Sequence, residues 1–316
     1  PARGVRPPPS RTNWTRLVPP SVLTGRVQAC GGARGNKYRP SGCAALNDKI
    51  KGWRAAQLAA EVLRRGVHAG FNPINITTAM QALSKSQRPS PDEARALDLI
   101  QARAAEVAGD FPGRNVGYFT YLLGKMGARA RPHPLAIQYM LVRATEVPGD
   151  FNAQAAAMFM WGLATLRIDP PHEVVAAVLA QAESTSEGYL PQHVSMLFWA
   201  LSRLPTPPRQ TAEVSRLWET FARKVARSAG AFAPQNIENL LSALVHLALP
   251  LAQETSVQLQ HATLNKLWEC KPQDLCNILN ALSNLGAVHP APRPAPLKSA
   301  TGRSAANSPL RPTPPP

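Results

Sequence analysis

The sequence predicts an all-α protein, a superhelical solenoid of about six repeated antiparallel helix pairs with disordered, basic, Pro-rich tails. The first observation behind this prediction is an internal repeat with a period of 38–43 residues. The second is a helical spacing of apolar residues within each copy. This combination is typical of stacked helix pairs, because one pair cannot bury its own apolar face whereas a stack makes a continuous core. The copies begin at Phe71, Phe111, Phe151, Tyr189, Phe232 and Cys270.

Each copy is expected to open with one helix, named the A helix. Pro stands two positions after the opening residue in four of the copies, where its missing N–H would have no partner in the first helical turn. The side chains five, eight, nine, twelve and fifteen positions after the opening residue are nearly always apolar, which is helical spacing. The residue eleven positions on is small in five of the six copies, with Leu122 as the exception, so neighbouring A helices are expected to approach closely.

A second helix, named the B helix, is expected in each of the first five copies after a turn that usually contains Pro. Its apolar periodicity predicts helices over residues 92–107, 134–147, 172–183, 211–228 and 255–268. Residues 46–286 therefore form one repeat domain. Residues 1–45 and 287–316 contain basic residues and many Pro but no acidic residue and no periodic apolar face, which predicts disorder.

The positive charge of the chain is concentrated in these two ends. The formal net charge is +16, of which the ends contribute +12 and the repeat domain +4. Basic ends can contact phosphates without sequence preference, although a simple bias of composition explains them equally well. The acid-free start, which contains Arg and Ser, is also typical of an organelle transit peptide.

Several kinds of protein are disfavoured by what the sequence lacks. It has four Cys without a C-x-x-C pair, so neither a disulfide framework nor a metal site is expected. No stretch approaches the length of a membrane span, and no phosphate-binding loop, dinucleotide-binding loop or hydrolase motif is present. We therefore expect no enzyme activity, no cofactor and no contact with a membrane.

The last three copies carry a family resemblance. The segment Pro272–Gly286 reads P-Q-D-L-x-N-x-L-x-A-L-x-x-L-G, and related strings begin at Pro234 and Pro191. This pattern resembles the octotricopeptide repeat, a family related to the helical regions of organellar proteins that carry a RAP domain. It weakens where Gly113 and Ala153 replace the Pro. The resemblance implies a protein of the mitochondrion or chloroplast that holds single-stranded RNA on a concave face, about one base per repeat, for RNA processing, stabilisation or translation.

The polar side of the A helices contains the candidate RNA-binding residues. Amides and hydroxyls there offer donors and acceptors to splayed bases, basic residues can hold phosphates, and aromatic rings such as Trp161 and Trp199 can stack on bases. The candidates are Asn75, Thr78, Lys85, Arg114, Asn115, Tyr118, Lys125, Gln192, His193, Arg203, Gln235, Asn236, Asn239, Gln273, Asp274 and Asn277.

Each part of this hypothesis has an alternative. The amides can cap the A helices or bond to the next repeat, and Trp161 and Trp199 can belong to the core with Phe159 and Phe198. The protein can instead be a structural rRNA-binding component of an organellar ribosome, with other ribonucleoprotein components as partners. A scaffold that binds other proteins is the alternative from a different class.

Overall fold

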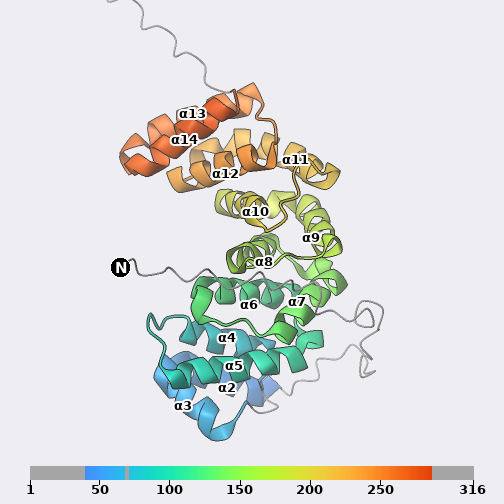
Figure 1. Ribbon diagram of the computed structural model, residues 1–316, viewed down its shortest axis with the longest axis vertical. Helices are drawn as coiled ribbons and strands as arrows, with labels where there is room; N and C mark the ends of the chain where they lie inside the picture. Colours follow the sequence, from blue (N-terminus) through green and yellow to red (C-terminus); the bar gives the residue numbers. More distant parts are fainter. Residues whose placement is uncertain (1–39, 68–70, 287–316) are drawn as a thin grey trace, which may run out of the picture.

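The computed structural model describes residues 40–67 and 71–286, and this part of the chain consists of helices and turns without strands. A and B helices alternate along it (Figure 1). The A helices are α2 (Pro40–Gly52), α4 (Pro73–Leu83), α6 (Gly113–Met126), α8 (Ala153–Leu166), α10 (Pro191–Arg203), α12 (Pro234–Leu247) and α14 (Pro272–Asn284). The B helices are α3 (Ala55–Arg65), α5 (Pro91–Glu106), α7 (Pro134–Glu146), α9 (His172–Ser184), α11 (Ala212–Ser228) and α13 (Gln253–Asn265).

The two kinds of helix form two layers. Each A helix contacts the A helix before and after it, from α2 to α14, and each B helix does the same from α3 to α13. In Figure 1 the stack is bowed, with α8 and α10 on its inner side and α9 and α11 on its outer side. Contacts between sequential neighbours are the organisation of a solenoid, so the all-helical, stacked fold class is confirmed.

The predicted apolar positions of the A helices form the core. In the copy that opens at Phe232, all five predicted core residues are fully buried: Ile237, Leu240, Leu241, Leu244 and Leu247. The B helices α5, α7, α9 and α11 lie within one residue of their predicted ends. Helix α13 begins two residues before the predicted start, and it ends three residues before the predicted end because Leu267–Glu269 (η7) forms a separate 3-10 turn.

The start of the folded region was predicted wrongly. Helix α2 begins at Pro40, inside the segment expected to be disordered, and α2 and α3 make a helix pair before the copy that opens at Phe71. Only Ile50 of α2 is fully buried and Leu46 is partly buried, so this helix has little apolar periodicity to read. The rest of the two predicted disordered tails lies outside the described residues.

Helices α6 and α8 approach each other closely because both carry Gly at the contact. A Cβ atom at Gly117 would lie 2.3 Å from the carbonyl oxygen of Ala155, and one at Gly162 would lie 2.4 Å from that of Thr120. At Gly113 a Cβ atom would lie 2.7 Å from Phe151, which leaves no room for a Pro ring. The departure from the Pro pattern at this copy therefore has a packing cause.

A side chain from the B helix ties several copies to their own opening residue. The opening residue ends a turn, so its carbonyl group has no helical partner and needs another donor. Arg143 Nε donates to the carbonyl oxygen of Phe111 (2.9 Å), Gln181 Nε2 to that of Phe151 (3.2 Å) and Lys266 Nζ to that of Phe232 (2.9 Å). These donors differ in residue type, although their structural role is the same.

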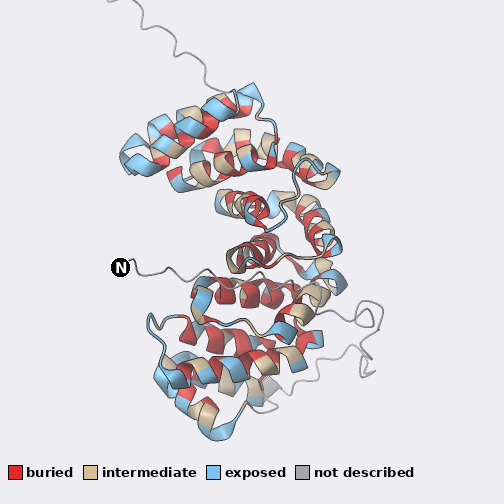
Figure 2. Cartoon of the chain, viewed as in Figure 1, coloured by how far each residue is buried: buried red, intermediate tan, exposed pale blue. Residues whose placement is uncertain are grey.

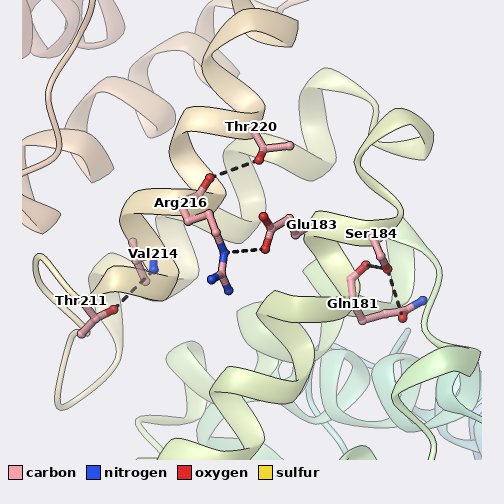
Figure 3. Close-up of polar contacts among 7 residues, drawn as sticks. All are labelled: Gln181, Glu183, Ser184, Thr211, Val214, Arg216 and Thr220. Atoms are coloured by element: carbon pink, nitrogen blue, oxygen red, sulfur yellow. Dashed lines mark hydrogen bonds and ion pairs between the residues drawn. The ribbon is translucent and has the colours of Figure 1, made fainter.

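The outer layer is polar, with ion pairs between some of its helices. Arg216 of α11 reaches Glu183 of α9 at 2.9 Å, and the hydroxyl of Thr211 accepts from the backbone N–H of Val214 at the start of α11 (Figure 3). Both residues of the ion pair are partly or largely exposed, so this contact adds little to the free energy of unfolding.

Burial is uneven along the stack (Figure 2). Helices α6 and α8 are mostly buried, whereas α13, η7 and α14 expose large apolar side chains, including Leu264 (63%), Trp268 (80%) and Leu279 (56%). The residues that correspond to Leu279 in the copies that open at Phe151 and Phe232, Met160 and Leu241, are fully buried. The last A helix is therefore an open edge of the described stack.

Candidate functional site

Two adjoining hollows lie along the A helices. The first has a volume of about 630 Å³ and is bordered by residues of α4, α6 and α8, including Arg114, Tyr118 and Lys125. The second has a volume of about 480 Å³ and is bordered by residues of α8, α10 and α12, including Trp161 and Trp199. Gln154 and Met158 border both hollows, so the two form one surface from α4 to α12, here named the A-face groove.

The charges on this face have one sign over most of its length. Helices α4 and α8 contain no Asp, Glu, Lys or Arg, α6 contains Arg114 and Lys125, and α10 contains Arg203. None of these three cations forms an ion pair within residues 40–67 and 71–286. The B helices carry most of the acidic residues: Glu61, Asp92, Glu93, Asp98, Glu106, Glu146, Glu173, Glu183, Glu213, Glu219 and Glu254. The groove between α4 and α10 thus favours an anionic ligand.

Aromatic side chains on the A helices divide into two sets. Phe119, Phe159 and Phe198 are fully buried in the core. A second set is only partly buried and follows the groove; it comprises Tyr118, Tyr121, Trp161 and Trp199 and is named the aromatic row. The predicted alternative that Trp161 and Trp199 belong to the core with Phe159 and Phe198 therefore holds for the two Phe, whereas the two Trp border the groove.

Most of the predicted site residues lie on this face with an exposed or partly exposed side chain. Thr78 and Arg203 do so without bordering either of the two hollows, and the hydroxyl of Thr78 donates to the carbonyl oxygen of Ile74 at 2.8 Å. Lys85 is exposed just after the end of α4 and borders a different hollow, which Glu93 of α5 also lines. Those that border one of the two hollows are Arg114, Asn115, Tyr118, Lys125, Gln192, His193, Asn236 and Asn239.

Three predicted site residues are buried, although one of them, Asn115, also borders the first hollow. Asn75 is fully buried in α4. Asn115 Nδ2 donates to Thr77 Oγ1 at 3.1 Å and so joins α6 to α4. The carboxylate of Asp274 accepts from the backbone N–H of Lys271 at 3.4 Å, as the third residue of a capping box does. For Asn115 and Asp274 the alternative of capping and bonding between repeats is the correct one.

Three of the five predicted amides on α12 and α14 are bonded to each other through an acid. Gln235 Nε2 donates to one carboxylate oxygen of Glu238 at 2.8 Å, and Asn277 Nδ2 donates to the other at 3.1 Å. Gln273 Nε2 in turn donates to Asn277 Oδ1 at 2.9 Å. These four residues are named the Glu238 network, and it places a carboxylate where the sequence suggested neutral amides for bases.

Sequence reasoning did not place Gln154, Met158, Tyr121 and Met196 among the site residues, although all four border the groove. The signal was present in the register of the repeat. Tyr121, like Trp161 and Trp199, stands ten positions after its opening residue, next to the core position nine. One residue along a helix is a rotation of about 100°, so these two positions face different sides.

Burial affects two titratable groups in the groove. It lowers the pKa of His193, whose ring also accepts a weak hydrogen bond of 3.4 Å from the backbone N–H of Leu190. Burial, together with the neighbouring Tyr121, raises the pKa of Tyr118. Both groups are therefore neutral at pH 7, and the positive charge of the groove comes from Lys and Arg alone.

Comparison with models of known protein families and with curated proteins found no match for this chain. Within the described residues, no three His, Cys, Asp or Glu side chains gather as metal ligands would. In the same part of the chain, every helix is too short or too polar to cross a membrane.

Proposed function

We propose that this protein binds single-stranded RNA in the A-face groove. The observation that carries the proposal is the combination of three cations that form no ion pair within the described residues, a row of aromatic rings and no acidic side chain on α4, α6, α8 and α10. Cations neutralise phosphates and rings stack on bases, and a splayed single strand offers both at once. In a duplex the bases stay stacked on each other, so only the phosphates are available for contacts with the groove.

The finer parts of the proposal rest on the resemblance to octotricopeptide repeats. They are a stack of about six repeats that hold roughly one base each, a location in the mitochondrion or chloroplast, and a role in RNA processing, stabilisation or translation. In this role the chain binds the RNA, and other proteins catalyse any reaction on it.

The test is a titration of the full chain with a fluorescently labelled single strand of mixed sequence, followed by anisotropy at several salt concentrations. The affinity should fall steeply as salt rises, because each phosphate contact releases counterions. The same strand in a duplex should bind more weakly at every salt concentration.

A pair of charge variants separates the groove from the basic ends of the chain. Arg114→Gln with Lys125→Gln removes two cations from the groove and should reduce the slope of log K against log salt by about 1.4. The matched control, Arg223→Gln with Arg227→Gln, removes the same charge from exposed positions on α11. The control should leave the slope almost unchanged.

Three other outcomes would contradict the proposal. An equal loss of salt dependence in both double variants would mean that the overall positive charge of the protein attracts the RNA and that the groove does not hold it. Contacts spread over folded rRNA, found by crosslinking in an extract, would favour a ribosomal component. Absence of RNA binding above background would favour a scaffold for proteins.

A further inference from the structure

The aromatic row is continuous across three consecutive A helices. Ring centroids lie 6.2 Å apart between Tyr118 and Tyr121, 5.1 Å between Tyr121 and Trp161, and 6.5 Å between Trp161 and Trp199. The row thus runs from α6 through α8 to α10. All four members are partly buried and pack against the core, and all four border the groove.

The two Trp rings are stacked side by side. Their planes are 28° apart and their centroids are separated by 6.5 Å. This separation lies within the range of about 4.5–7 Å that is usual for offset-stacked aromatic pairs. Because both rings also border the same hollow, they form one continuous aromatic surface beside it.

The polar groups around the row match the other parts of a nucleotide. Lys125 borders the same hollow as Tyr118 and Tyr121, and the Arg203 guanidinium lies 6.0 Å from the centre of the Trp199 ring. Gln154 lies on the border shared by both hollows. Cations stand at both ends of the row, and a neutral amide is available for a base edge in the middle.

We infer that the aromatic row is a base-stacking platform, on which the bases of an unpaired strand lie against the rings while Lys125 and Arg203 hold the adjoining phosphates. This inference rests on the proposed function, and it names how that ligand is held. Every base has a π-face, so stacking does not depend on base identity. The part of the site on α6, α8 and α10 is therefore tolerant of sequence and selects unpaired strands over duplexes.

The experiment compares three Trp variants of the full chain in the same anisotropy titration. Trp161→Leu and Trp199→Leu remove a flat ring but keep an apolar side chain, and each should weaken binding by about 5-fold to 100-fold. Because no charge is lost, the salt slope should stay that of the wild type. Trp268→Leu is the matched control, since Trp268 is 80% exposed but does not border the groove; its affinity should equal that of the wild type.

Phe variants keep the test decisive if a Leu variant loses stability. Trp161→Phe and Trp199→Phe retain a ring and should bind within a few-fold of the wild type. The double Phe variant should lose most of the quenching of Trp fluorescence that bound RNA causes in the wild type, because the remaining Trp residues of the described chain lie outside the groove.

The outcomes separate this inference from the function on which it depends. If Trp161→Leu and Trp199→Leu bind RNA with the affinity of the wild type, the proposed RNA binding is retained and the stacking platform is rejected. An equal loss in Trp268→Leu would reject the platform as well. A wild-type protein that binds no RNA would reject both.

Discussion

The middle and the C-terminal end of the A layer have the same repeat but different chemistry. In the middle, α6 and α8 meet at Gly117 and Gly162, and their groove side carries aromatic rings and cations. At the end, α12 and α14 present an amide network centred on Glu238. The copies that match the repeat pattern best are thus those whose groove residues bond to each other.

This difference shows that a repeat pattern records the core rather than the site. The pattern is set by the apolar positions that every copy needs, such as Leu241 and Leu244. The copies that open at Phe111 and Phe151 depart from it at Gly113 and Ala153, and at Gly113 the close approach of Phe151 leaves no room for a side chain. It is these departing copies that border the larger hollow.

The largest effect should come from the core of the middle copies. Leu163→Ala should lower the free energy of unfolding by about 2–5 kcal/mol, because Leu163 is buried between neighbours on both sides of the stack. Leu282→Ala at the equivalent position of α14 should cost less, since the open edge of the stack can relax around the space. Urea unfolding of both variants measures the two costs, and equal costs would contradict an edge at α14.

A Cβ atom at the contact between α6 and α8 should have the next largest effect. Gly117→Ala should cost about 1–3 kcal/mol despite the better helix propensity of Ala, because the added atom meets backbone rather than a flexible side chain. Gly109→Ala is the control, since nothing lies within 4 Å of the added atom. Thermal unfolding followed by circular dichroism compares the two, and a stabilised Gly117→Ala would mean that the helices separate easily.

Neutralising the acid of the Glu238 network should extend the binding surface. Glu238→Gln removes the one carboxylate among the four residues of that network, and we expect RNA affinity to rise by about two-fold to five-fold at low salt. Glu219→Gln makes the same charge change on the exposed side of α11 and should have no such effect. An unchanged affinity in Glu238→Gln would indicate that the strand ends before α12.

The smallest effect should be a pH dependence from His193. Burial lowers the pKa of this His in the folded state, so the unfolded chain binds more protons as the pH falls below about 6.5. His193 therefore lowers the free energy of unfolding progressively as the pH falls from about 7 through the ordinary pKa of His, about 6.5. His193→Gln should flatten the fall in melting temperature over that range, whereas His261→Gln, at an exposed position of α13, should leave it as in the wild type.

Much of the fold could be predicted because it depends on local periodicity. Position nine after each opening residue is apolar in nearly every copy, and Met160, Phe198 and Leu241 at this position are fully buried. The helix pair before Phe71 could not be found in this way, because α2 buries few apolar residues.

The site was harder to predict because polar residues serve the fold and the surface alike. Asn115 and Asn236 both follow the opening residue by four positions and both border the groove, yet the first is buried and bonded to Thr77 of α4 whereas the second is partly exposed. The position in the repeat does not distinguish an amide that bonds to the preceding helix from one that is open to the groove. By contrast, the position of Trp199 one residue after the buried Phe198 could have been read from the register alone.

The bonds from B helices to opening carbonyl groups have a mechanical consequence. Arg143, Gln181 and Lys266 each close their own copy, whereas successive copies meet mainly through apolar faces. Side-chain bonds join neighbouring copies only at scattered points, such as Asn115 to Thr77, Arg216 to Glu183 and Asn277 to Glu238. Pulled from its two ends, the chain should therefore lengthen in steps of one copy at a time. Each step would release on the order of 130 Å of extended backbone. The copies between α6 and α13 would therefore unfold one at a time under force and refold one at a time when the force is removed.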